Sequence, residues 1–156
     1  MAYEISISQK LSPSLEPHAS TLKTFMQSFY ATSDNPTAHE EYAREYFTPD
    51  ATLIMGGKRA TGFDEILSLR KSLWTKVSSR RHTATKIFFG GESDLMLFGK
   101  VVYVMKGTSN DDGVELDWSA RAEFVFDDGE SKKPRMKYYQ VYLDTAAQLA
   151  AAQKAL

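Results

Sequence analysis

The side chain of this sequence best suited to proton chemistry is His82. It stands near the start of a segment, residues 80–90, in which apolar residues alternate with polar ones. An imidazole accepts and releases a proton near neutral pH without extreme tuning. We therefore expect His82 to carry a proton in a candidate site, although a structural histidine at the end of a sheet would give the same pattern. His18 and His39 occupy positions that favour the surface.

A charged strand supplies the second group of candidates. Alternation over residues 113–127 places two sets on opposite faces: Asp117, Ser119, Arg121 and Glu123, against Trp118, Ala120, Ala122, Phe124 and Phe126. The second face is typical of a core. The charged face is either a solvated or dimer face, or the polar wall of a pocket. In a dry pocket Asp117 could orient a base and Arg121 could stabilise an enolate, but on an open face such a pair contributes little.

Tyrosines and apolar residues complete the candidate site. Tyr30 ends an apolar helical stripe, so its ring should lie inside and its hydroxyl should need a partner. Tyr103 shares a strand face with apolar residues and is expected inside as well. Either hydroxyl could polarise a carbonyl as a neutral donor. We interpret Asp34, four residues after Tyr30, as a helix cap. Walls for a hydrophobic substrate, or an ordinary core, could come from Phe25, Met55, Trp74 and Trp118.

Composition limits the other possibilities. The 156 residues contain no cysteine, which excludes disulfides, thiolate metal sites and cysteine nucleophiles. Three scattered histidines give no metal-ligand spacing, and no phosphate loop is present. A net charge of −1 gives no footprint for nucleic acid or an anionic membrane. The N-terminus is unlike a signal peptide and no apolar run is long enough to span a membrane, so we expect a cytoplasmic protein, and the residue types above predict no metal site.

The elements that must position these residues change period along the chain. Helical periods predict helices over residues 15–30 and 36–47, a short strand over 51–55 follows, and a capping box at 61–64 opens a third helix. Residues 1–14 are a flexible tail or a short extra strand. From residue 80 the period is two, which predicts further strands over 80–90, 94–107, 113–127 and 134–143.

This order predicts an α+β fold. Strands joined by short turns pair as an antiparallel meander, and each of the three N-terminal helices has one apolar stripe to bury against the sheet. We expect a cone-shaped, curved antiparallel sheet covered by those helices, with a deep cavity inside. Asp144 can cap a final Ala-rich helix over 145–156.

Several segments in this order resemble the nuclear transport factor two-like superfamily, and most of all its SnoaL-like and scytalone-dehydratase-like branch in its fungal small-protein form. They are Phe29-Tyr30-x-x-Ser33-Asp34, Phe47-Thr-Pro-Asp-Ala51, Gly62-Phe-Asp-Glu-Ile66, Arg80-x-His82 and Leu97-Phe-Gly99-x-Val-x-Tyr103. The resemblance implies a cystatin-like roll over residues 15–145, with residues 146–156 as a C-terminal helix. It also implies a homodimer built on the outer face of the sheet, and acid–base chemistry without a cofactor.

Two functions remain open from the sequence. The first is an acid–base isomerase, dehydratase or cyclase of secondary metabolism, acting on a small apolar oxygenated molecule such as a polyketide or terpenoid intermediate. Its catalytic residues would be His82, Asp117, Tyr30, Tyr103 and Arg121. The second is a non-catalytic ligand-binding or dimerisation module of the same fold. Epoxide hydrolysis is a weaker third possibility, because no Asp–Arg–Asp arrangement can be assembled within one strand.

Overall fold

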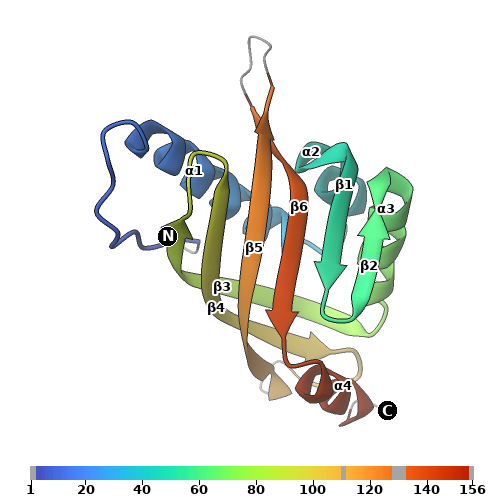
Figure 1. Ribbon diagram of the computed structural model, residues 1–156. Helices are drawn as coiled ribbons and strands as arrows, with labels where there is room; N and C mark the ends of the chain where they lie inside the picture. The colour runs from blue at the N-terminus through green and yellow to red at the C-terminus, as the bar shows by residue number, and fades with distance from the viewer. Residues whose placement is uncertain (1–2, 110–111, 128–132, 155–156) are drawn as a thin grey trace.

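A single curved sheet carries the site. The computed structural model describes residues 3–109, 112–127 and 133–154. Its six strands lie in the order β2-β1-β6-β5-β4-β3, and neighbours are antiparallel except for the parallel pair β1 and β6. The strands are β1 (Phe47–Met55), β2 (Lys58–Thr61), β3 (Val77–Phe89), β4 (Asp94–Met105), β5 (Val114–Phe126) and β6 (Pro134–Leu143). In Figure 1 the lower parts of β3 and β4 swing across below β5 and β6, so the sheet wraps into a cone.

Local irregularities produce this curvature. The register of β3 against β4 shifts between Ala84 and Lys86, and that of β5 against β6 shifts between Glu123 and Phe124. Bulges of this kind bend a strand and increase its twist. Gly99 lies opposite Ala84, and a Cβ there would overlap the carbonyl oxygen of Thr83. The paired strands β3 and β4 can therefore approach each other this closely only because residue 99 is glycine.

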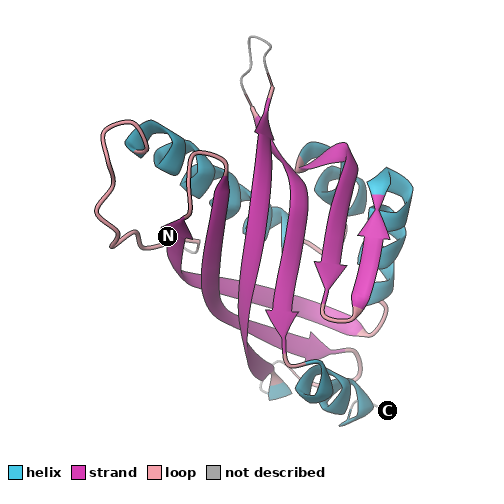
Figure 2. Cartoon of the chain, in the orientation of Figure 1, coloured by secondary structure: helices cyan, strands magenta, loops and turns pink. Residues whose placement is uncertain are grey.

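Three helices cover the inner face of the sheet, as expected (Figure 2). They are α1 (Glu16–Ser33), α2 (His39–Glu45) and α3 (Gly62–Leu73). The predicted stripe of α1 is buried in full, namely Leu22, Phe25, Met26, Phe29 and Tyr30. These side chains pack on the inner residues of the sheet, so the α+β cone fold predicted from the sequence is confirmed.

The boundaries of several elements differ from prediction. α2 begins at His39 rather than residue 36. Before it, the Asn35 side chain accepts hydrogen bonds from the backbone N–H and the hydroxyl of Thr37 and so forms a turn. At α3, Glu65 rather than Asp64 accepts the hydrogen bond from the Thr61 backbone N–H, at 2.7 Å. β1 begins at Phe47, which pairs with Met136 of β6.

The two ends of the described chain pack onto the sheet. Ser6 forms a bridge to Lys86 of β3 and Ile5 is buried, so part of the expected tail extends the sheet at its β3 edge. At the other end, Asp144 accepts hydrogen bonds from the first turn of α4 (Thr145–Lys154), as predicted. No helix in the described ranges is long and apolar enough to cross a membrane.

The unpredicted strand β2 follows a tight hairpin. Gly56 at its turn has a φ of +57°, which glycine adopts without a steric cost. A Cβ at this position would also lie 2.5 Å from Cγ2 of Thr145. The turn therefore packs directly against α4, and both segments border the cavity described next.

Candidate active site

A cavity of about 710 Å³ lies between the sheet and its covering helices. Inner-face residues of the sheet line its interior, among them His82, Val101, Tyr103, Trp118 and Tyr139. Further lining residues come from α1, α2 and the end of α3, from the segment joining α3 to β3, from the β1–β2 turn, and from α4. In Figure 1 α4 lies at the lower end of the cone. A cavity of this size and largely apolar lining suits a small organic ligand.

His82 is paired with the carboxylate of Asp34, a residue interpreted from the sequence as a helix cap. Its Nδ1 lies 2.6 Å from Oδ1 of Asp34, and its backbone N–H donates to Oδ2 at 2.7 Å. Asp34 is the C-cap residue of α1, and its side chain is only 5 % exposed. Because a carboxylate only accepts, Nδ1 must carry the proton of a neutral ring. The basic lone pair is then on Nε2.

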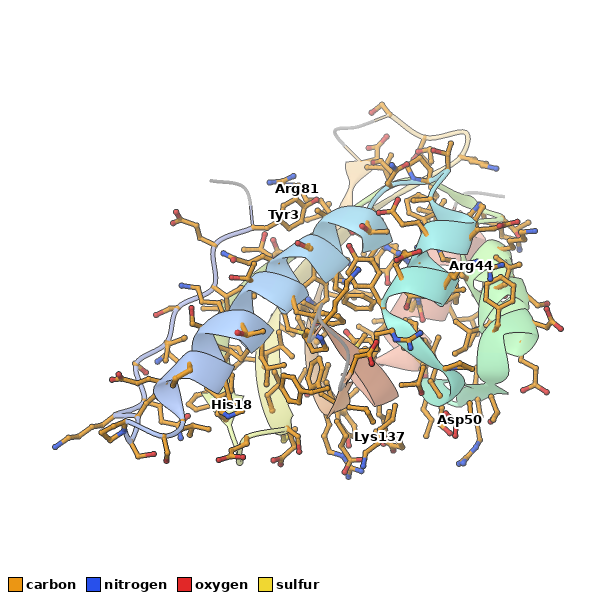
Figure 3. The ribbon with its side chains drawn as sticks, turned by 90° about the horizontal axis from the view of Figure 1, so that it is seen from above. Tyr3, His18, Arg44, Asp50, Arg81 and Lys137 are labelled. Atoms are coloured by element: carbon orange, nitrogen blue, oxygen red, sulfur yellow. The ribbon has the colours of Figure 1, made fainter. Side chains whose placement is uncertain are left out.

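The N-terminal segment adds a third hydrogen bond to this carboxylate. The hydroxyl of Tyr3 donates to Oδ2 of Asp34 at 3.0 Å. The guanidinium of Arg81 stands over the Tyr3 ring, 5.2 Å from its centroid, and Figure 3 shows the two side chains together beside α1. Asp34 therefore accepts three hydrogen bonds, from the Tyr3 hydroxyl, the His82 backbone N–H and the His82 Nδ1, which together fix the orientation of its carboxylate.

The charges around the pair favour an ionised Asp34 and a neutral His82. Burial alone would raise the pKa of the Asp34 carboxyl, but the bonds from His82 and the charge of Arg80 lower it below its ordinary value of 3.8. Burial lowers the pKa of the His82 imidazole below 6.5. The bond and charge of Asp34 oppose that effect, whereas Arg80 and Arg70 add to it. At neutral pH the ring is therefore an uncharged base.

Two buried arginines hold the end of α1 in place. Arg70 of α3 donates to the carbonyl oxygens of Ser33, Thr32 and Asn35. Arg80 donates to the carbonyl and, at 2.9 Å, to the hydroxyl of Ser33, and its Nε lies 3.7 Å from Oδ1 of Asp34. Carbonyls at a helix C-terminus lack intrahelical partners. The arginines supply these partners and so position the Asp34 carboxylate.

Aromatic rings enclose the histidine. The His82 ring centroid lies 5.1 Å from that of Tyr30 and 5.6 Å from that of Trp118. The partner expected for the Tyr30 hydroxyl is the hydroxyl of Tyr139, at 2.8 Å. Tyr30 is 1 % exposed and packs behind His82. Of these hydroxyls, only that of Tyr139 belongs to a residue lining the cavity.

The other candidates from the sequence divide into two groups. Tyr103, Met55 and Trp118 line the cavity. Phe25 instead packs among Phe29, Tyr46 and Phe124, and Trp74 lies under the guanidinium groups of Arg70 and Arg80. Both are therefore core residues rather than cavity walls, which corrects the prediction that they bind the substrate.

Asp117 and Arg121, predicted as catalytic residues, lie outside the cavity, which corrects a second prediction. Asp117 is on the outer face, 84 % exposed, with its carboxylate 2.9 Å from Nζ of Lys100. Arg121 lies on the same face, over the Tyr138 ring and 3.8 Å from Glu123. The physical reason is that the inner face of a cone must be largely apolar, so the alternate, charged face of β5 points away from the cavity. Neither residue can orient His82.

The residues that sequence reasoning missed are Asp34, Arg80 and Tyr139. Arg80 is two residues before His82, so strand alternation places it on the same face. Asp34 is four residues after Tyr30, so the helical period places both on one side of α1. These relations were available, but nothing local connects Asp34 with His82, which is 48 residues away.

Comparisons with solved structures find the same fold. A protein assigned as a SnoaL-like polyketide cyclase from Jannaschia sp. CCS1 superposes with a TM-score of 0.67 and 12 % identity, covering 93 % of this chain and 97 % of the other. Nuclear transport factor 2 from Cryptosporidium parvum gives 0.66 at 16 % identity, over 88 % and 100 %. A Catenulispora acidiphila protein with a ketosteroid isomerase-like fold gives 0.66 at 16 %, over 83 % and 92 %. No protein-family model and no curated protein matches the sequence.

These neighbours define the class of the molecule as the nuclear transport factor two-like fold, in agreement with the resemblance seen in the sequence. At sequence identities of 12 to 16 %, these three similarities support the fold and nothing more specific. The fold alone does not determine a function, whereas the cavity and its carboxylate-paired histidine are observed in this chain itself.

Proposed function

We propose that the protein is a cofactor-independent acid–base enzyme that acts on a small, largely apolar, oxygenated molecule. The observation that carries the proposal is the 2.6 Å contact between His82 Nδ1 and Asp34 at the wall of the cavity. A buried carboxylate fixes the tautomer of an adjacent imidazole and stabilises the imidazolium that forms when the ring takes a proton. In this arrangement His82 Nε2 is the general base.

The proposed reaction begins with removal of a proton from the carbon next to a carbonyl. The proton passes to His82 Nε2, and the electron pair moves to the carbonyl oxygen as an enolate. Tyr103 can donate to that oxygen, because burial raises the pKa of its hydroxyl and keeps it protonated. Return of the proton from His82 at another atom gives isomerisation. If that proton instead goes to a β-hydroxyl, the C–O bond breaks, water leaves and the result is dehydration. Attack by the enolate carbon on a second carbonyl, whose new alkoxide takes the proton from His82, gives cyclisation.

The surroundings support an organic ligand of modest size. Trp118, Val101, Met105 and Val141 are among the apolar residues that line the cavity. Such walls exclude water and strengthen the electrostatic contacts within. Structures of Catenulispora acidiphila proteins with this fold contain small molecules, S-DNPA in one and trimethylamine in another.

The alternative is a non-catalytic binding or dimerisation module. It predicts a cone filled by its own side chains, or a cavity without a titratable group facing it. A cavity of about 710 Å³ lined by His82 fits neither expectation, which is why the enzyme is the better-supported proposal.

The test is the exchange of deuterium from solvent into the carbon next to the carbonyl of model bicyclic ketones. We expect His82→Ala to slow exchange by about 10²- to 10⁴-fold, the usual contribution of a general base. Asp34→Asn should slow it by about 10²-fold or more, since the amide can hold the wrong tautomer. The matched controls His18→Ala and Asp117→Asn, at residues away from the cavity, should leave the rate unchanged. Equal rates for the wild type and His82→Ala would refute the proposal.

We also propose that the molecule is a homodimer built on the outer face of the sheet. Large apolar side chains are exposed there on adjacent strands, namely Phe88, Met96, Phe98, Val125 and Tyr142. Phe88 and Phe98 are stacked at 6.3 Å. Contiguous exposed apolar groups of this kind usually mark an interaction surface.

A further inference from the structure

The charge of the cavity lining differs from that of the molecule as a whole. The sequence contains 20 acidic and 19 basic residues. The charged residues that line the cavity are nevertheless all basic, namely Lys58, Lys76 and Arg80. No Asp or Glu is among the lining residues of the described chain, so the charged side chains of the lining contribute a positive potential. A concave site with low-dielectric walls concentrates that potential.

Arg80 is the deepest of these cations. Its side chain is 5 % exposed and it stacks over Trp74, 4.7 Å from the ring centroid. Its Nε is buried and makes no hydrogen bond with a described residue. Arg80 and Arg70 together face one carboxylate, Asp34, and the carbonyl end of α1. A buried charge is expensive unless it is compensated, and these two arginines outweigh the negative charge that surrounds them.

Lys58 and Lys76 come from different segments at the border of the cavity. Lys58 begins β2 immediately after the Gly56–Gly57 turn, and Lys76 lies between α3 and β3. Both side chains are exposed, and neither has an acidic partner within 4.0 Å among the described residues. Two uncompensated ammonium groups at this border attract an anion and increase its association rate.

We infer that the site takes a small apolar organic anion, a flat aromatic or polyketide-like acid whose carboxylate or phenolate oxygen lies against Arg80. Its apolar body packs on Trp118, Val101 and Met105. The inference rests on the proposed function for the identity of the site, but it concerns binding and does not require proton transfer. A neutral ligand of the same shape would lack this charge-assisted contact with Arg80 and would bind more weakly.

A matched pair of ligands tests this directly. Calorimetry with 2-naphthoate and 2-naphthamide compares a carboxylate with a neutral group on the same ring system. We expect naphthoate to bind about tenfold more tightly or better, the value of one charge-assisted hydrogen bond. Arg80→Gln should abolish this preference, whereas Lys100→Gln, which removes an outer-face cation, should keep it. Equal affinities in the wild type, or a preference that survives Arg80→Gln, would overturn the inference.

Arg80 also supports the end of α1, so its variant could fail to fold, as circular dichroism would reveal. The Lys58→Gln, Lys76→Gln double variant removes exposed side chains only and should slow naphthoate association severalfold while leaving naphthamide unchanged. An unchanged association rate would contradict the inference. Naphthoate preference in His82→Ala separates the two proposals. If the preference persists there but deuterium exchange does not depend on His82, the ligand class holds and the catalytic proposal fails.

Discussion

The pairing of His82 with Asp34 shows how a buried site sets the protonation of a single ring. A histidine beside a carboxylate is usually easier to protonate, but here burial and two arginines have the larger combined effect and lower the pKa of His82. An uncharged imidazole beside an ionised carboxylate is the resting state that a general base requires. The arginines therefore serve the base as well as the fold.

This pKa shift predicts how stability depends on pH. The unfolded chain protonates His82 at its ordinary value of 6.5, whereas the folded chain does so only at lower pH. Between those two values the unfolded state binds more protons, so the free energy of unfolding must fall as the pH falls. We expect urea unfolding to show this loss below pH 6.5 in the wild type and a smaller loss in His82→Gln. Identical pH profiles would contradict the assigned shift.

For single residues, the sequence indicated His82 as a candidate but did not indicate its partner. His82 could be identified because its residue type and its strand position are both local properties. The Asp34–His82 contact depends on where the end of α1 meets β3, which no local pattern encodes. Asp117 was the wrong acid for a related reason. Alternation separates the two faces of β5 correctly. In a cone, however, the cavity is lined by the apolar face that also forms the core, so the charged face with Asp117 points outward.

The end of α1 is the element on which the site depends. Arg70 is 2 % exposed and donates to three carbonyl oxygens there. Burial lowers the pKa of its guanidinium to about 10, so it stays charged at neutral pH. Asp34 follows this turn and Arg80 donates to Ser33 within it, so the Arg70 side chain connects α3 with the His82–Asp34 pair.

Arg70→Met should therefore destabilise the protein by about 3 kcal/mol or more, since it removes three charge-assisted hydrogen bonds to the end of α1. The same substitution at Arg59, an exposed residue of the edge strand β2, should change stability by no more than about 0.5 kcal/mol. Urea denaturation of the two variants measures the difference. Similar midpoints for both would show that the three hydrogen bonds contribute little.

Among the elements, α1 and the four long strands agree with the sequence prediction because each has many residues of one period. β2 was missed because it has only four residues, of which Ala60 alone is buried. The N-terminal segment was left open for a similar reason, since one bridge at Ser6 gives no repeating pattern. Short elements are determined by their neighbours, and their neighbours lie far away in the chain.

For the whole molecule, the proposed dimer makes a direct prediction about mass. Light scattering should give about twice the chain mass of 17.5 kDa for the wild type. The Phe88→Lys, Phe98→Lys variant should be monomeric, because charged groups on the outer face oppose its burial. Leu149→Lys is the matched control, since Leu149 is 59 % exposed but borders the cavity instead. A monomeric wild type would contradict the dimer and leave the cavity proposal intact.

The cone holds a neutral histidine, and no described residue forms a hydrogen bond with the Nε2 of His82, so this atom can take a proton. Nitrogen-15 NMR of the histidine rings measures this without a substrate, because protonated and unprotonated ring nitrogens have distinct shifts. For His82 at about pH 7 we predict a protonated Nδ1 and an unprotonated Nε2, with this preference lost in Asp34→Asn. A proton on Nε2, whether in the other neutral tautomer or in an imidazolium, would contradict the account.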